Sequence, residues 1–203
     1  MPEKKVKYLD PKNDLTFRKI FGEHPKIMKS FLNSILPLKE GQQIVELSYL
    51  EPELIPELPS LKRSIVDVNC IDNNGRQFIV EMQMYWTSAF KQRMLFNGSK
   101  AYVRQLKKKE KYTELKSVYG LSLVDDIYLP QHKDIYYHHY QFVHTEINQE
   151  IIQGLEFVFV ELPKFKSRNI TDKKMQTLWL RFLTEIDEDT DNVPKELIED
   201  EHI

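Results

Sequence analysis

The sequence predicts an α/β fold in which a mixed β-sheet is flanked by helices. Strand-like apolar runs occur in two groups, one long helical pattern connects the groups, and further helical patterns stand at both ends of the chain. A chain of 203 residues, 41% of them apolar, is long enough to bury one core. We therefore expect one domain over residues 1–186, followed by an acidic tail over 187–203.

The expected elements are separated by clear turn signals. Asp10-Pro11 and Asn13-Asp14 precede the first helical pattern, which Pro25 divides into two helices. The proline-rich stretch over 51–62 is expected to be a loop or an edge strand. The expected strands cover 44–50, 64–71, 76–84, 116–124, 135–147 and 155–162, and the remaining helices cover 87–109 and 173–185.

Composition and charge exclude several classes of protein. No run approaches the ~18 apolar residues of a membrane span, and the first residues lack the apolar segment of a signal peptide. The single cysteine, Cys70, cannot form an internal disulfide, so we expect a cytoplasmic protein. No glycine-rich phosphate loop occurs, so no nucleotide cofactor is expected. The net charge is −2, so a polyanionic partner would have to meet a local cluster of cations.

Residues 62–84 read KRSIVDVNCIDNNGRQFIVEMQM, which predicts a β-hairpin with DNNG at its turn. A three-residue loop favours a left-handed residue at its last position, and this suits Gly75. Such a loop places Asp72 opposite Arg76, whereas a two-residue loop would shift the pairing by one residue. We expect the three-residue loop.

Four polar side chains gather on one face of this predicted hairpin. In the expected register Asp67 lies opposite Glu81, and strand alternation adds Asn69 and Gln83 to their face. Two carboxylates about 5 Å apart repel each other, and a hard cation such as Mg²⁺ or Mn²⁺ would remove this conflict. From the spacing alone, a solvated sheet face remains the favoured interpretation. The other face is expected to pack in the core, through Val66, Val68, Cys70, Phe78, Val80, Met82 and Met84.

The helix predicted over 87–109 carries a row of basic side chains. Helical spacing places the row within a sector of ~60°, and puts Leu95, Tyr102 and Leu106 on the opposite side, facing the sheet. Such a row favours the phosphate backbone of DNA, although solvated lysine-rich helix faces are as common. The row consists of Arg93, Lys100, Arg104, Lys107 and Lys111, with Asn97 in its gap.

Four motifs, in this order along the chain, resemble those of the PD-(D/E)XK nuclease superfamily, and more narrowly its transposase-like family of recombination-promoting nucleases. The resemblance covers about residues 8–185 and implies a restriction-endonuclease-like core. It also implies a bacterial DNA endonuclease associated with transposition or recombination. The motifs are DLTFRKIFG at 14–22, KRSIVD at 62–67, the D…ExQ pattern of Asp67, Glu81 and Gln83, and ELPKF at 161–165.

The resemblance also implies roles for individual residues. Asp67 and Glu81 would hold Mg²⁺, or Mn²⁺ in its place, together with the backbone carbonyl of Met82. Gln83 stands where most PD-(D/E)XK enzymes have a lysine that orients or activates the attacking water, and an amide can bind water but carries no charge. Asp14 matches an acidic position near the N-terminus and is a candidate ligand or base, with a helix N-cap as the alternative.

Other residues are candidates for contact with DNA. Lys62 and Arg63 precede a hairpin strand and suit phosphate contact, with solvated charge as the alternative. Arg93 stands nearest the hairpin and is the best candidate for the scissile phosphate. The main alternative function is a non-catalytic DNA-binding or assembly module that keeps the nuclease fold. The basic row and the acidic tail also permit a homodimer, and no membrane partner is expected.

Overall fold

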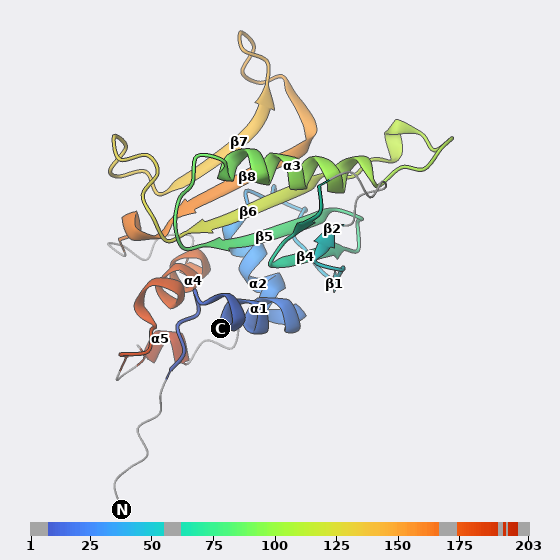
Figure 1. Ribbon diagram of the computed structural model, residues 1–203. Coiled ribbons are helices and arrows are strands. Elements are labelled where there is room, and N and C mark those ends of the chain that lie inside the picture. Colours follow the sequence, from blue (N-terminus) through green and yellow to red (C-terminus); the bar gives the residue numbers. More distant parts are fainter. Residues whose placement is uncertain (1–7, 55–61, 167–173, 191–192, 194, 199–203) are drawn as a thin grey trace, which may run out of the picture.

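The computed structural model describes residues 8–54, 62–166, 174–190, 193 and 195–198, and it confirms the predicted α/β class. A six-stranded mixed sheet has helices on both faces, with α3 (Phe90–Val103) on one side (Figure 1). The other side carries α1 (Asp14–Glu23), α2 (Pro25–Ile35) and α4 (Lys174–Glu185). The short helix α5 (Lys195–Ile198) contacts α4 within the segment expected to be an acidic tail. None of the described helices is long and apolar enough to cross a membrane.

The strand order is β1-β4-β5-β6-β8-β7, in which β5, β6 and β8 are parallel and the other pairs are antiparallel. The carboxyl ends of the three parallel strands therefore share one edge of the sheet. A separate pair, β2 with β3, precedes β4. The bounds are β1 Leu47–Tyr49, β2 Glu53–Leu54, β3 Ser64–Ile65, β4 Val68–Asp72, β5 Gln77–Gln83, β6 Val118–Val124, β7 Tyr137–Val143 and β8 Ile151–Glu161.

Strand alternation sends side chains into two cores. Val68 and Val80 pack with α1, α2 and α4, whereas Ile79 packs beneath α3. Val66 was expected on the same face as Val68 but packs with Ile79. The expected strand over 64–71 is interrupted by a bend at Asp67, and this bend reverses the alternation.

Helix α3 is shorter than expected and presents a different face to the sheet. It ends at Val103, and Leu95, expected to face the sheet, is 45% exposed. Asn97, expected in the basic row, is fully buried. The buried face consists of Phe90, Met94, Asn97, Gly98 and Ala101.

Glycine at two facing positions lets α3 lie close to the sheet. A Cβ on Gly98 would lie 2.8 Å from Cζ of Phe157, and a Cβ on Gly120 would lie 2.6 Å from Cδ1 of the same ring. The ring of Phe157 therefore occupies the space that both glycines leave. This close approach lets the face of α3 that carries Phe90, Met94 and Ala101 pack directly on the sheet.

Gly98→Ala is expected to lower the free energy of unfolding by about 1–3 kcal/mol, because the added methyl group overlaps the Phe157 ring. Gly22→Ala is the matched control, since its Cβ would meet only Cγ2 of Val68, at 3.9 Å, and alanine is the better helix former. Urea unfolding of both variants measures the difference. Equal effects of the two substitutions would contradict the close packing of α3.

Candidate functional site

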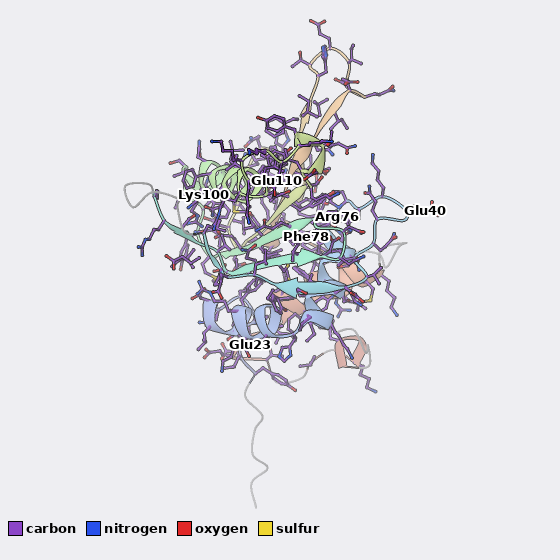
Figure 2. The ribbon with its side chains drawn as sticks, turned by 90° about the vertical axis from the view of Figure 1, so that its right-hand side faces the viewer. Glu23, Glu40, Arg76, Phe78, Lys100 and Glu110 are labelled. Atoms are coloured by element: carbon purple, nitrogen blue, oxygen red, sulfur yellow. The ribbon has the colours of Figure 1, made fainter. Side chains whose placement is uncertain are left out.

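The turn of the hairpin is held as the sequence predicts. The Asp72 N–H donates to the Arg76 carbonyl at 3.0 Å, and Gly75 has a φ of 80°. The Asp72 carboxylate also accepts hydrogen bonds from the Asn74 and Arg76 N–H groups, at 2.9 and 2.8 Å, and from Arg76 Nε at 2.7 Å. Arg76 and Phe78, which begin the returning limb, lie side by side in Figure 2. These bonds confirm the three-residue loop.

The register that follows brings the two predicted carboxylates together. The β4–β5 ladder extends to the pair Val68–Val80, so the next residues, Asp67 and Glu81, are opposite each other. Both side chains are largely buried. The alternative of a solvated sheet face is therefore wrong, because α3 covers the Glu81 side of the sheet.

Asp67 lies at the bend between β3 and β4, where its side chain takes the place of a strand partner. Its Oδ2 accepts the Met82 N–H at 2.8 Å, and its Oδ1 accepts Nη2 of Arg18 at 2.9 Å. Burial raises the pKa of Asp67, and although the Met82 N–H and Arg18 oppose this effect, the pKa stays above its ordinary value. The bend thus directs the Asp67 carboxylate towards the backbone of β5.

Glu81 is 5% exposed and lies beneath α3. Its Oε1 accepts Nδ2 of Asn97 and its Oε2 accepts Nη2 of Arg93, both at 3.2 Å. Burial, partly offset by Arg93 and reinforced by the charge of Asp67, raises the pKa of Glu81 to about 7. The site thus contains two neighbouring carboxylates that resist ionising together.

The peptide group of Met82 faces Asp67. The carbonyl of the next residue, Gln83, accepts the Asp125 N–H at 2.9 Å on the β6 side, while the Met82 N–H donates to Asp67 on the other side. The N–H and C=O of one strand residue point the same way, so the Met82 carbonyl also lies on the Asp67 side. Two oxygen donors of the predicted ligand set, the Asp67 carboxylate and the Met82 carbonyl, therefore lie on the same side of β5.

Two buried polar atoms near Glu81 have no hydrogen-bond partner in the described part of the chain. They are Oδ1 of Asn97 and Oγ of Ser122. Ser122 is the register partner of Glu81 on β6, so both side chains are on the α3 side of the sheet. Buried groups of this kind are usually satisfied by water or a ligand, which suits a polar site.

Gln83 and Arg93 form one unit. Arg93 Nη2 donates to Gln83 Oε1 at 2.6 Å as well as to Glu81, and Gln83 Nε2 donates to the Tyr85 carbonyl at 2.5 Å. The guanidinium also lies 4.7 Å from the ring centroid of Phe90. The amide is thereby held with its oxygen towards a cation.

Asp14 reaches the site through Arg18. Asn13 is the N-cap of α1 and accepts the Leu15 N–H, so the N-cap interpretation of Asp14 is wrong. Exposed Asp14 accepts Nε of Arg18 at 3.0 Å, and Arg18 in turn binds Asp67. Arg18 was not predicted as a site residue, although its position four residues after Asp14 in the DLTFRKIFG motif is a signal for this pair.

Asn97 was predicted only as a gap in the basic row. It is instead a polar residue on the apolar face of α3, where it binds Glu81. Lys100 (Figure 2) was predicted to contact DNA, but its Nζ is already bonded within the protein. It donates to the carbonyls of Leu54 and Lys62, at 2.5 and 3.0 Å, and to Ser64 Oγ at 3.3 Å. Lys100 therefore ties β2 and β3 to α3.

The other predicted DNA contacts are dispersed. Arg63 is exposed and pairs with Glu53 at 3.7 Å. Arg104 caps the carboxyl end of α3, and Lys107 follows in the loop beyond it. Exposed Lys62 precedes β3. The structure therefore brings Arg93 to the carboxylates and leaves the rest of the row outside the site.

The site has two carboxylates at its centre. Within the described ranges, no group of three or more His, Cys, Asp or Glu side chains is placed to hold a metal ion. A cation there would need backbone, water or substrate oxygens as its remaining ligands, as is usual for Mg²⁺.

Comparison with known proteins agrees with this geometry. The family model described as "PD-(D/E)XK nuclease family transposase" matches residues 11–203, nearly the whole chain. No curated protein and no solved structure matches the chain. The matched range includes both carboxylates, Gln83 and both arginines, and supports a nuclease-related role. The chain belongs to the PD-(D/E)XK nuclease family of transposases.

Proposed function

We propose that the protein is a metal-dependent DNA endonuclease that hydrolyses phosphodiester bonds in transposition or recombination. The observation that carries this proposal is the buried pair of Asp67 and Glu81, opposite each other in the hairpin register. Each carboxylate forms an ion pair with an arginine. Arg18 of α1 pairs with Asp67 from one face of the sheet, and Arg93 of α3 pairs with Glu81 from the other. A structural sheet face has no need for such an arrangement.

The donor set supports a hard divalent cation. Asp67, Glu81 and the Met82 carbonyl would supply its protein ligands, and waters or phosphate oxygens would complete the coordination that Mg²⁺ or Mn²⁺ prefers. Such an ion stabilises developing negative charge and makes a bound water more acidic. Asn97 Oδ1 and Ser122 Oγ have no hydrogen-bond partner in the described part of the chain, which supports a polar ligand beside Glu81.

The charges of the chain complement a phosphodiester. The site contains three carboxylates and two guanidinium groups, so it carries one excess negative charge when all are ionised. The carboxylates are those of Asp14, Asp67 and Glu81, and they pair with Arg18 and Arg93. A divalent cation would turn this into one excess positive charge. The site would then attract one phosphodiester group, while Arg18 and Arg93 could turn from the carboxylates to phosphate oxygens.

Arg93 supplies the charge that the Gln83 amide lacks. Most PD-(D/E)XK enzymes carry a lysine at this position, and here the Gln83 oxygen holds a guanidinium at 2.6 Å instead. A guanidinium at this point can steady the charge on a phosphate in the transition state. Gln83 would thus act by orienting Arg93 and by hydrogen bonding to the attacking water.

Arg93→Gln is expected to lower the cleavage rate by about 10²–10³-fold, the usual effect of removing one charge-stabilising donor. Adding Gln83→Lys to this variant should restore part of the rate, because it returns a cation to the same place. Lys26→Gln, which removes an exposed cation from α2 on the opposite face of the sheet, is the control and should change the rate only slightly. A rate unchanged by Arg93→Gln would remove Arg93 from the mechanism.

The proposed function is tested with the purified chain and plasmid DNA. Nicking or linearisation is expected with Mg²⁺ or Mn²⁺ and should stop when EDTA is added. A crystal soaked in Mn²⁺ should show metal density between Asp67 and Glu81. Intact plasmid in both metals, together with no metal at the carboxylates, would show that the protein is not a metal-dependent endonuclease.

The alternative function is a DNA-binding or assembly module without cleavage. The observation that favours it is the neutral amide of Gln83, which binds Arg93 and the Tyr85 carbonyl and so leaves no cationic side chain of its own. In that case DNA binding should survive Glu81→Ala unchanged and should still require Arg93 and Arg104.

A further inference from the structure

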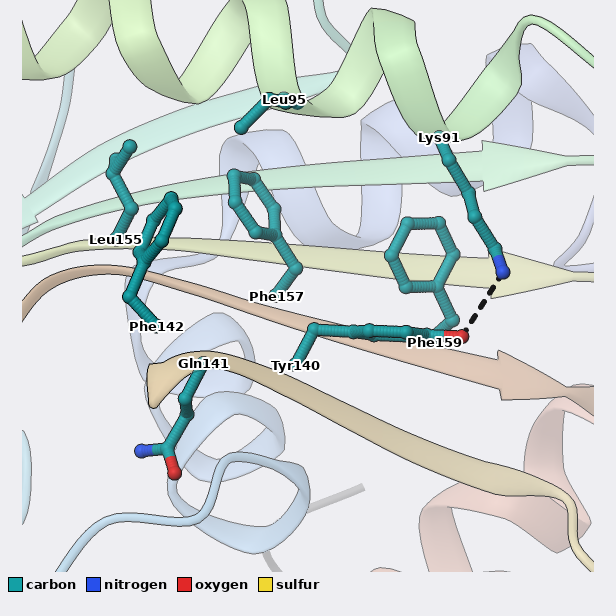
Figure 3. Close-up of a pocket in the computed structure, with 8 residues that line it drawn as sticks. All are labelled: Lys91, Leu95, Tyr140, Gln141, Phe142, Leu155, Phe157 and Phe159. Atoms are coloured by element: carbon teal, nitrogen blue, oxygen red, sulfur yellow. Dashed lines mark hydrogen bonds between the residues drawn. The ribbon is translucent and has the colours of Figure 1, made fainter. Parts of the chain in front are cut away.

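A groove lies between α3 and the β7–β8 hairpin (Figure 3). Its volume is about 210 Å³, smaller than a typical pocket for a drug-sized ligand and suited to a single ring system. Except for Lys91 and Gln141 the lining is apolar, and Figure 3 shows the Gln141 side chain pointing away. The lining residues are Lys91, Leu95, Tyr140, Gln141, Phe142, Leu155, Phe157 and Phe159.

Lys91 provides a positive charge at one end of the groove. Its Nζ donates to the Tyr140 hydroxyl at 3.0 Å and lies 4.7 Å from the ring centroid of Tyr128 and 5.0 Å from that of Tyr140. These rings hold the ammonium group in place. In the described part of the chain no carboxylate lies within 4.0 Å of it, in contrast to Arg18 and Arg93. A fixed ammonium without a carboxylate partner favours an anionic ligand.

The walls of the groove offer exposed apolar surface next to this charge. Phe142 is 47% exposed and Tyr140 is partly exposed, both on β7, and Leu95 faces them from α3. Proteins that bind single-stranded nucleic acid combine these two features, because bases stack on aromatic rings while cations meet the phosphates. A purely apolar partner would leave the ammonium group unmatched.

We propose that this groove binds one unpaired nucleotide of the DNA substrate, with its base against Tyr140 and Phe142 and its phosphate on Nζ of Lys91. The inference rests on the proposed function, since it assigns a second contact to the same DNA. It makes the preferred substrate a DNA with unpaired bases near the cleaved bond, such as an overhang, a flap or a single strand.

The position of the groove agrees with this assignment. Lys91 and Arg93 both belong to the first turn of α3, and side chains two residues apart leave a helix about 200° apart. Arg93 reaches Glu81 on one side while Lys91 reaches Tyr140 on the other. The unpaired nucleotide and the cleaved phosphate would therefore contact side chains that leave the first turn of α3 in different directions.

The test is binding in EDTA, where cleavage cannot occur. A short single strand containing 2-aminopurine and a duplex of the same sequence are titrated with the full chain. The wild type should bind the single strand more tightly and quench the 2-aminopurine. Lys91→Gln and Phe142→Ala should each weaken single-strand binding about fivefold or more and relieve the quenching, with little effect on the duplex.

Two matched controls separate the groove from general effects. Lys26→Gln removes an exposed cation from α2, on the opposite face of the sheet, and Ile152→Ala trims a 74% exposed side chain on the same hairpin but outside the groove. Both should bind as the wild type does. Thermal unfolding of all variants establishes that they are folded.

The outcomes distinguish this inference from the proposed function. Unchanged single-strand binding by Lys91→Gln and Phe142→Ala overturns the inference, even if the wild type cuts plasmid. The inference is equally wrong if these variants change only the oligomeric state, because the groove is then a contact between copies. Binding that depends on both residues in a protein without metal-dependent cleavage supports the inference and overturns the endonuclease.

Discussion

Replacing Glu81 by glutamine is expected to abolish metal-dependent cleavage and to make the metal-free protein more stable. The cleavage rate should fall at least about 10³-fold, because the substitution removes one of two carboxylates proposed to hold the metal. The shape of the side chain and its hydrogen bond from Asn97 can be kept by an amide. The loss of rate would therefore reflect the lost charge rather than a disturbed fold.

The gain in stability follows from the pKa of Glu81. Burial raises this pKa from 4.5 to about 7, so the folded protein binds more protons than the unfolded chain between these values, and stability falls as the pH rises through this range. Above pH 7, the raised pKa of Glu81, about 7 in place of 4.5, lowers the free energy of unfolding by at most about 3 kcal/mol. Glutamine does not ionise and avoids this loss, so the stability of Glu81→Gln relative to the wild type should increase from pH 4.5 to pH 7.

Urea unfolding in EDTA at several pH values measures this difference. Exposed Glu40 (Figure 2) provides the matched control, since Glu40→Gln makes the same chemical change at the surface and should alter neither rate nor stability. Mn²⁺ should stabilise the wild type at pH 8 and leave Glu81→Gln unchanged. A variant that still cuts, or that is less stable than the wild type at pH 8, would contradict the role given to Glu81.

Glu161→Gln is expected to cost about 3–5 kcal/mol of stability at pH 7, because it leaves a buried lysine without its counter-ion. Glu161 is fully buried at the end of β8, in the ELPKF motif. It accepts Nζ of Lys164 at 2.5 Å, Nε2 of His138 at 2.8 Å and the N–H groups of Tyr128 and Leu129 at 2.7 and 3.1 Å. Lys164 also donates to the carbonyls of Leu129, His132 and Ile135.

The pH dependence of this effect has the opposite sign to that of Glu81. Burial opposes the ionisation of Glu161, but the bonds from Lys164, Leu129, His138 and Tyr128 outweigh it and hold the pKa below the ordinary 4.5. Its stabilising contribution is therefore complete above pH 4.5 and is lost as the pH falls through the lowered value. The difference between wild type and Glu161→Gln should be full at pH 7 and shrink below pH 4.5.

Urea unfolding at pH 7 and in acid tests this prediction. Glu185→Gln is the matched control, because its pair with Arg181 is a partly exposed i,i+4 pair worth about 0.3–0.5 kcal/mol. Adding Lys164→Met to Glu161→Gln should recover part of the loss by removing the unpaired buried charge. A cost below about 1 kcal/mol at pH 7 would contradict the structural role of this pair.

The central pair of the site was predictable because a tight turn sets strand register by local rules. The DNNG turn with Gly75 at its left-handed position places Asp67 opposite Glu81, and this needs no information from distant residues. The burial of these carboxylates was not predictable from spacing. It depends on α3, which packs closely on the sheet where the Phe157 ring fills the space that Gly98 and Gly120 leave.

Local sequence rules thus determined the hairpin, its register, the α/β class and, with the family motifs, the identity of the carboxylates. The tertiary structure decided the rest of the site. Arg18 and Arg93 approach from opposite faces of the sheet, and only folding brings them to Asp67 and Glu81. Their contacts join segments far apart in the chain, whereas periodicity and turn chemistry report only on near neighbours. Burial and charge pairing, which set how these carboxylates ionise, therefore belong to the folded protein.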